Sequence, residues 1–131
     1  MTPSAVLLDT HVVLWALQDP HHLGSARAIV EDAAVTRYLS AACVWEVAIK
    51  TALNRLELPI PVSAWARQAA ADLAAERLPI TDVHAAAVAD LPLHHHDPFD
   101  RILVAQALSL GVPIVTADAA IARYSVKTID V

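Results

Sequence analysis

The stretch Ala5-Val6-Leu7-Leu8-Asp9-Thr10 decides the fold of this chain, because an apolar run ends there at an acid and a helical pattern follows at once. A short continuous apolar run favours a strand that is buried on both faces. The pattern over residues 10–17 predicts a helix directly after this strand. In open parallel sheets, ligands bind beyond the carboxyl ends of the strands, so Asp9 lies where a functional site is expected.

The same alternation of short strands and helices continues along the chain. Strands are predicted over residues 5–8, 37–40, 78–80, 114–116 and 126–129, and helices over residues 10–17, 25–34, 42–53, 62–76, 82–89, 98–110 and 118–122. We expect Ser25 to cap the second helix and Gly111 to end the sixth. This pattern predicts one α/β domain over residues 1–131, a three-layer α/β/α sandwich with a mainly parallel central sheet.

Length and composition narrow the class of protein. The chain has 131 residues, enough for one domain with a core, and its net charge of -5 argues against a general nucleic-acid coat protein. A single cysteine, Cys43, favours a reducing cytoplasm, and we expect it to be a small buried residue. No apolar run is long enough to span a membrane, so no membrane association is expected. The hydrophobic share of 56% favours a homodimer that covers apolar faces.

Acids occur at strand ends and in the first turns of the helices that follow. The four that we expect to be catalytic are Asp9, Glu46, Asp100 and Asp118. Carboxylates gathered at one sheet edge raise one another's pKa, and a hard divalent cation relieves this repulsion. Oxygen ligands select Mg²⁺ or Mn²⁺ rather than Zn²⁺. We expect Asp9 and Asp100 to bind the metal, with Glu46, Asp118 and Asp97 as further candidate ligands, in a site that activates water for attack on a phosphate.

Most of these acids also have a purely structural explanation. Asp9 and Asp118 fit the N-cap position of a helix. Asp97 and Asp100 lie at a helix N-terminus, where the helix dipole favours negative charge. Capping would be the preferred explanation for Asp9 alone, but the presence of the other acids favours metal binding.

Several neighbouring residues are candidates for supporting roles. Thr10, Ser40 and Thr116 are expected to hydrogen-bond the carboxylates or water, and turn or cap roles explain them equally well. Trp45 and Ile49 are expected to lie in the core.

The run His94-His95-His96 raises the question of a zinc site. Consecutive residues rarely converge on one ion, and no cysteines accompany them. A solvated loop is the favoured interpretation, with room for one ring near the acids. The pair His21-His22 has the same interpretation.

Four stretches occur in a fixed order along the chain: Leu8-Asp9-Thr10-His11-Val12-Val13-Leu14-Trp15, Ser40-Ala41-Ala42-Cys43-Val44-Trp45-Glu46-Val47-Ala48-Ile49-Lys50, His96-Asp97-Pro98-Phe99-Asp100-Arg101-Ile102-Leu103-Val104-Ala105-Gln106-Ala107 and Ile114-Val115-Thr116-Ala117-Asp118. Together they resemble PIN-domain proteins of the VapC toxin type, from about residue 6 to the C-terminus. The residues at the family's acidic positions are Asp9, Glu46, Asp100 and Asp118. Cys43 stands where the family often has serine, and Asn54 where glycine is common.

The resemblance implies a PIN-like fold and a ribonuclease that uses Mg²⁺ or Mn²⁺. It further implies the toxin of a toxin–antitoxin pair, held inactive by a cognate VapB-like antitoxin and forming a homodimer. Lys50, Arg55 and Arg101 are then candidates for contacts with RNA phosphates. For Lys50 the alternative is an ion pair with Glu46, four residues earlier on the same helix.

Two other classes of function compete with a ribonuclease. A phosphotransfer domain on a similar sheet would use an acid pair near the first strand, but no second acid lies two residues after Asp9, and Glu46 would have no role. A catalytically inactive module that only binds partners is opposed by the presence of all four acids. RNA cleavage with and without EDTA separates these alternatives.

Overall fold

The computed structural model describes residues 2–131, and its centre is a five-stranded sheet in the order β3-β2-β1-β4-β5. The strands are β1 (Ala5–Leu8), β2 (Thr36–Ser40), β3 (Glu76–Leu78), β4 (Ile114–Thr116) and β5 (Thr128–Asp130). Every pairing between neighbouring strands is parallel. The predicted α/β fold with a parallel central sheet is therefore confirmed.

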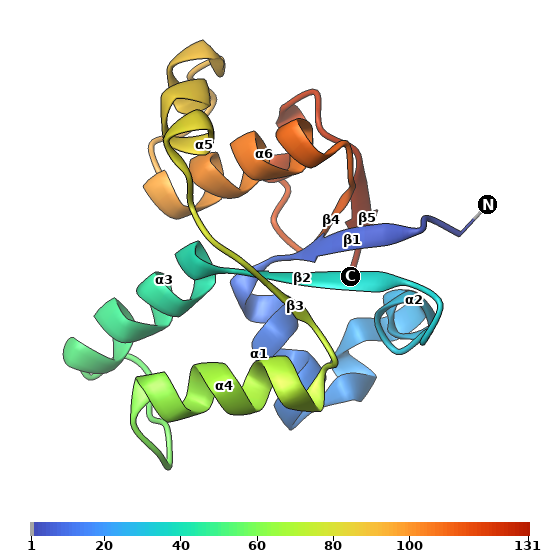
Figure 1. Ribbon diagram of the computed structural model, residues 1–131, viewed down its shortest axis with the longest axis vertical. Helices are drawn as coiled ribbons and strands as arrows, with labels where there is room; N and C mark the ends of the chain where they lie inside the picture. Colours follow the sequence, from blue (N-terminus) through green and yellow to red (C-terminus); the bar gives the residue numbers. More distant parts are fainter. Residues whose placement is uncertain (1) are drawn as a thin grey trace.

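Helices cover both faces of this sheet. They are α1 (Thr10–Gln18), α2 (Arg27–Val30), α3 (Ala41–Ala52), α4 (Val62–Asp72), α5 (Asp82–Ala87) and α6 (Pro98–Leu110), with the 3₁₀ turns η1 (Pro20–Ala26), η2 (Val88–Asp90) and η3 (Ile121–Arg123). In Figure 1, α5 and α6 lie above the sheet, whereas α1, α3 and α4 lie below it, which gives the expected three layers. Among residues 2–131, no helix combines the length and apolar character that crossing a membrane requires.

The second predicted helix, over residues 25–34, is wrong in extent. The chain forms η1 and then the short α2, and Ser25 lies inside η1 rather than at a cap. Gly24 has a φ of 55° and a ψ of -131°, which breaks the helical path just before Ser25.

Other predicted boundaries also shift, and the strand predicted over residues 78–80 lies at Glu76–Leu78 instead. The helix predicted to reach residue 76 ends with Asp72, because Ala74 has a positive φ of 47° and turns the chain into β3. Helix formation predicted from residue 118 begins only with η3, and the last strand begins at Thr128 rather than residue 126. Gly111 ends α6 in the left-handed conformation, as predicted.

The order of the strands creates a switch point beside β1. The chain builds β1, β2 and β3 in one direction across the sheet and then returns to place β4 on the other side of β1. The apolar residues Val6, Leu7 and Leu8 are fully buried in this central strand. The backbone N–H of Asp9 donates to the carbonyl of Val115 at 3.1 Å, which brings the carboxyl ends of β1 and β4 together. A crevice outside such a switch point is the expected ligand site of this architecture.

Candidate active site

Asp9 follows β1 directly, and both of its carboxylate oxygens are held. Oδ1 accepts a hydrogen bond from the backbone N–H of Thr10 at 2.7 Å and so caps α1. Oδ2 accepts from the hydroxyl of Thr116, also at 2.7 Å, from the end of β4. Only 5% of the residue is exposed, and this burial raises the pKa of Asp9 despite the two hydrogen bonds, which act to lower it. The cap expected from the sequence is present, and the carboxylate is fixed at the switch point.

Glu46 approaches Asp9 from α3. Its Oε1 accepts a 2.6 Å hydrogen bond from the hydroxyl of Thr10, and its Oε2 lies 3.0 Å from Nζ of Lys50. Thr10 therefore connects the turn after β1 with α3, and the ion pair expected from the i, i+4 spacing is present. The charge of Glu46 contributes to the raised pKa of Asp9.

Asp100 lies in the first turn of α6 and is buried. Burial, together with the nearby charges of Asp97, Asp9 and Asp118, raises its pKa to about 8. Nε2 of His95 lies 3.2 Å from Oδ2 of Asp100. Asp100 is therefore the acid whose ionisation is opposed by the charges of its three acidic neighbours.

Asp97 and Asp118 lie at the rim of this cluster. Oδ1 of Asp97 accepts hydrogen bonds from the backbone N–H groups of Phe99 and Asp100, at 2.9 and 3.3 Å, and caps α6. Oδ1 of Asp118 accepts from the backbone N–H of Ala120 at 2.9 Å. Both acids have the local structural roles that their positions suggest, while their charges act on Asp100.

The donor set fits a hard divalent cation. Among residues 2–131, no three His, Cys, Asp or Glu side chains are arranged closely enough to hold one ion. Asp9, Asp97 and Asp118 are nevertheless near enough to Asp100 for their charges to raise its pKa. A cation would supply the positive charge that this set lacks, and carboxylate oxygens suit Mg²⁺ or Mn²⁺. Asp9 and Asp100 could hold it, with Glu46 beside them.

The candidate supporting residues divide into two groups. Thr10 and Thr116 contact the carboxylates of Glu46 and Asp9, as described above. Ser40 does not: its hydroxyl donates to Oε1 of Gln106 at 2.6 Å and accepts from the backbone N–H of Ala42, which caps α3. Of the two roles that the sequence offered for Ser40, the cap is therefore present, and the contact with the site carboxylates is not.

Arg101 is also placed differently from the expectation that it contacts RNA. Its guanidinium donates to the carbonyls of Pro92 and Val88, at 2.9 and 3.2 Å, and to the hydroxyl of Tyr124 at 3.0 Å. These bonds hold the loop before α6 in place. The guanidinium is therefore occupied by contacts within the protein rather than free to bind RNA. Arg55, by contrast, is exposed.

A groove with a volume of about 460 Å³ adjoins the acids. It is lined by Glu46, Ile49, Lys50, Leu53, Arg55, His96, Asp97, Pro98 and Phe99. The basic side chains of Lys50 and Arg55 and several apolar side chains therefore lie on the same surface, next to Glu46.

Trp45 and Ile49 were expected in the core, and this is wrong. Trp45 is 55% exposed and packs edge-on against Phe99, with ring centroids 5.0 Å apart, while Ile49 is 38% exposed. Helix α3 buries the face that carries Ala42, Cys43 and Val47. Trp45 and Ile49, four residues apart, consequently lie on the other face.

Cys43 is buried with its Sγ 3.5 Å from the carbonyl oxygen of Leu8. Burial raises the pKa of this thiol to about 12. The prediction of a small buried cysteine is confirmed, and its raised pKa disfavours the thiolate that a nucleophile requires.

The histidine run is not uniformly solvated. His96 is exposed, but His95 is half-buried, with Nδ1 2.8 Å from the hydroxyl of Tyr124 and Nε2 near Asp100. The sequence offers no signal that selects His95 from its neighbours, and Tyr124 lies outside every motif. One ring of the run does lie near the acids, as the sequence allowed, but which one could not be told in advance, and Tyr124 was missed.

Comparisons with known proteins agree with this fold. The sequence model of the PIN domain family matches residues 6–127. Ribonuclease VapC22 of Mycobacterium tuberculosis (strain ATCC 25618 / H37Rv) is 33% identical over 116 residues, 88% of each chain. The crystal structure of VapBC2 from Rickettsia felis, bound to a promoter DNA fragment, aligns with a TM-score of 0.70 and 10% identity over 97% of this chain and 98% of that one. VapBC-5 from Mycobacterium tuberculosis aligns with a TM-score of 0.59 and 24% identity over 98% and 100%. This chain belongs to the PIN-domain family and, within it, to the VapC type.

Proposed function

We propose that this protein is a divalent-metal-dependent endoribonuclease that acts as the toxin of a toxin–antitoxin pair. The observation that carries the proposal is the buried acid cluster at the switch point, where three neighbouring acids raise the pKa of Asp100. The relative at 33% identity bears the name of a ribonuclease, which supports RNA as the substrate.

Hydrogen bonds within the chain orient the site carboxylates before substrate binds. Thr116 and the backbone of Thr10 fix the Asp9 carboxylate, and the Thr10 hydroxyl fixes Glu46. Bound Mg²⁺ or Mn²⁺ would supply the positive charge that activates water and stabilises charge developing on the phosphate. Such a site needs no nucleophilic side chain, which is consistent with the inert thiol of Cys43.

The groove beside Glu46 suits a single-stranded RNA. Arg55 is exposed there, and Lys50 is partly exposed while paired with Glu46. Phe99 and Trp45 add aromatic surface at the same place, and bases stack on aromatic rings without strong sequence preference. We propose that Arg55 and Lys50 bind RNA phosphates and lead the scissile bond toward Asp9.

An antitoxin is the proposed protein partner. Two of the solved structures with this fold are VapBC2 and VapBC-5, the latter described as a member of a family of toxin–antitoxin systems. The groove combines apolar Ile49 and Leu53 with adjacent acids, so it suits an inhibitor segment that carries apolar residues and an arginine. Inserted among Asp9, Glu46 and Asp100, that arginine would compete with metal, so inhibition should weaken at higher Mg²⁺.

We also propose a homodimer. Large apolar side chains outside the groove are also exposed, among them Val83, Leu93, Leu108 and Leu110. Such surface is costly to leave in water and favours association. Light scattering at micromolar concentration should give the mass of two chains, and a monomer mass would exclude this part of the proposal.

RNA cleavage by purified protein tests the activity. Cleavage should require Mg²⁺ or Mn²⁺, stop in EDTA and fall by orders of magnitude in Asp9→Asn. Asp72→Asn is the matched control, because Asp72 is an exposed acid at the end of α4. Cleavage that persists in EDTA would exclude a metal-dependent enzyme. Binding of a partner without any cleavage of RNA would favour an inactive binding module.

A further inference from the structure

A chain of hydrogen bonds joins Arg101, Tyr124, His95 and Asp100. Nη1 of Arg101 donates to the hydroxyl of Tyr124 at 3.0 Å. That hydroxyl lies 2.8 Å from Nδ1 of His95, and Nε2 of His95 lies 3.2 Å from Oδ2 of Asp100. The chain links the loop before α6, the first turn of α6 and the segment after η3.

The partners set the direction of each bond. A guanidinium only donates, so the Tyr124 oxygen accepts from Arg101. The Asp100 carboxylate that would bind a cation is ionised and can only accept, so Nε2 of His95 then carries a proton and donates to Oδ2. When the ring is neutral, its Nδ1 accepts from the Tyr124 O–H. The other neutral tautomer would direct a lone pair at the ionised Oδ2, so an ionised Asp100 assigns the tautomer of His95.

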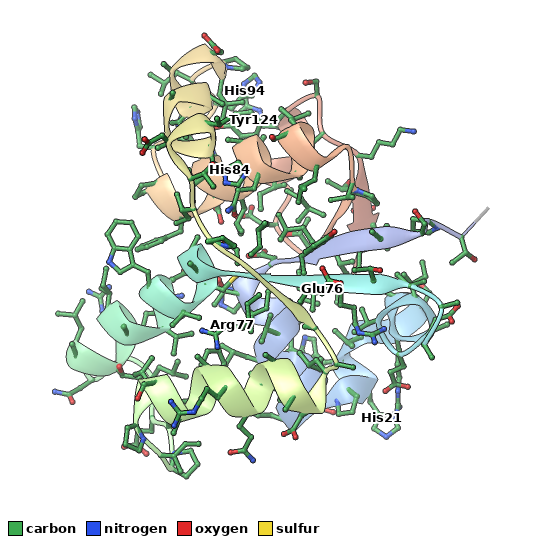
Figure 2. The ribbon with its side chains drawn as sticks, in the orientation of Figure 1. His21, Glu76, Arg77, His84, His94 and Tyr124 are labelled. Atoms are coloured by element: carbon green, nitrogen blue, oxygen red, sulfur yellow. The ribbon has the colours of Figure 1, made fainter. Side chains whose placement is uncertain are left out.

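Packing holds the middle of this chain in place. Tyr124 is only 4% exposed. The ring of His94 meets the Tyr124 ring edge-on, with centroids 4.8 Å apart, and Figure 2 shows these two side chains together near α6. Arg101 is fixed by its bonds to the loop carbonyls of Pro92 and Val88. The His95 ring is therefore held by hydrogen bonds at both nitrogen atoms, to Tyr124 at Nδ1 and to Asp100 at Nε2.

The same chain connects two of the site acids. The backbone of Ile121 donates to the carbonyl of Asp118 at 3.2 Å, and the backbone of Tyr124 donates to the carbonyl of Ile121 at 3.1 Å. Tyr124 thus ends a compact turn that begins at Asp118. Through His95, this turn is bonded to Asp100 on α6.

We propose that His95, fixed by Tyr124, is a positioning residue that holds the Asp100 carboxylate in the orientation in which it binds the divalent cation. The inference rests on the proposed metal-dependent function. Asp100 is repelled by Asp9, Asp97 and Asp118, and the donor at Nε2 of His95 opposes that repulsion at a defined oxygen. Outer partners of this kind orient ligating carboxylates, and their loss weakens metal binding.

Mn²⁺ binding to the purified full chain, measured by calorimetry without RNA, tests the proposal. We expect His95→Ala and Tyr124→Phe to weaken Mn²⁺ binding by about 10–100-fold. Tyr124→Phe keeps the ring and removes only the hydroxyl. His95→Gln retains an N–H donor that can reach Asp100 and should recover much of the affinity lost in His95→Ala. The control is His21→Ala, because His21 is exposed on η1, on the opposite side of the molecule in Figure 2.

The outcomes separate this inference from the proposed function. Weaker Mn²⁺ binding in both variants, with metal-free melting temperatures close to that of the wild type, supports positioning by His95. Wild-type affinity in His95→Ala or in Tyr124→Phe overturns it, whether or not the protein cleaves RNA. A wild-type protein whose Mn²⁺ affinity depends on His95 and Tyr124 but that does not cleave RNA would contradict the proposed function alone.

Discussion

The hydroxyl of Thr116 donates a 2.7 Å hydrogen bond to Oδ2 of Asp9, across the point where the sheet changes its strand order. The two residues are 107 positions apart in sequence and meet because β4 returns to the side of β1. Since the other oxygen of Asp9 is bonded to the backbone of Thr10, the carboxylate cannot rotate freely. The strand order therefore orients an acid of the candidate site, before any ligand binds.

Replacing Thr116 with valine removes this hydroxyl while nearly preserving the shape of the side chain. Mn²⁺ affinity measured by calorimetry should fall by about 10–100-fold in Thr116→Val, because Oδ2 of Asp9 loses the partner that orients it. Thr116→Ser keeps the hydroxyl and should bind Mn²⁺ nearly as tightly as the wild type. Equal affinities for the valine and serine variants would show that this bond does not prepare Asp9 for metal.

The raised pKa of Asp100 predicts how pH changes the stability of the metal-free protein. The folded-state pKa is about 8 and the ordinary value is 3.8, so the folded state holds this proton more tightly than the unfolded state. The contribution of Asp100 is therefore fully present below about pH 4 and is lost as pH rises through about 8. The measurement is chemical denaturation in EDTA from pH 5 to pH 9.

Asp100→Asn cannot ionise at this position and serves as the comparison. Its stability relative to the wild type should increase with pH over that range. A constant difference between the two proteins would mean that Asp100 has an ordinary pKa and that the acids do not repel one another strongly.

The local elements of the fold could be predicted from the sequence, whereas several tertiary contacts could not. The strand before Asp9 and the helix Pro98–Leu110 have clear apolar patterns and clear end signals, and both are found where the sequence places them. Trp45 is different, because the apolar pattern of α3 does not reveal which face the sheet covers. The same limit applies to Ser40, whose hydroxyl binds Gln106, 66 positions away.

The candidate site shows the same division. The acids could be predicted from motifs at strand ends, since ligands of open parallel sheets bind beyond the carboxyl ends of the strands. The positions of Arg101 and His95 depend on Tyr124, which reaches them from 23 and 29 positions away. No local pattern encodes a contact of that kind, because Tyr124 has an aromatic ring that equally suits a core position.

Metal should stabilise the folded protein. A ligand that binds only the folded state raises the melting temperature, and a cation would also relieve the repulsion around Asp100. We expect Mg²⁺ and Mn²⁺ to raise the melting temperature of the wild type in differential scanning calorimetry, and to raise it much less in Asp9→Asn. The matched control Asp72→Asn should respond as the wild type does. An equal response in Asp9→Asn would place the stabilising ion elsewhere.

Asn54 has a positive φ of 57° just after α3. Its N–H donates to the carbonyl of Thr51 at 3.1 Å, and the N–H of Arg55 donates to the carbonyl of Lys50 at 2.9 Å, so the turn ends α3 in a left-handed conformation. Asparagine tolerates this conformation, glycine adopts it without strain, and alanine resists it by about 1 kcal/mol. We therefore expect Asn54→Ala to lower the free energy of unfolding by about 1 kcal/mol in urea denaturation. Asn54→Gly removes the same side-chain amide but should change stability little, because the relief of strain offsets the greater entropy of the unfolded chain. Equal stabilities of the two variants would indicate that the loss of the amide, and not the backbone conformation, determines the effect at this turn.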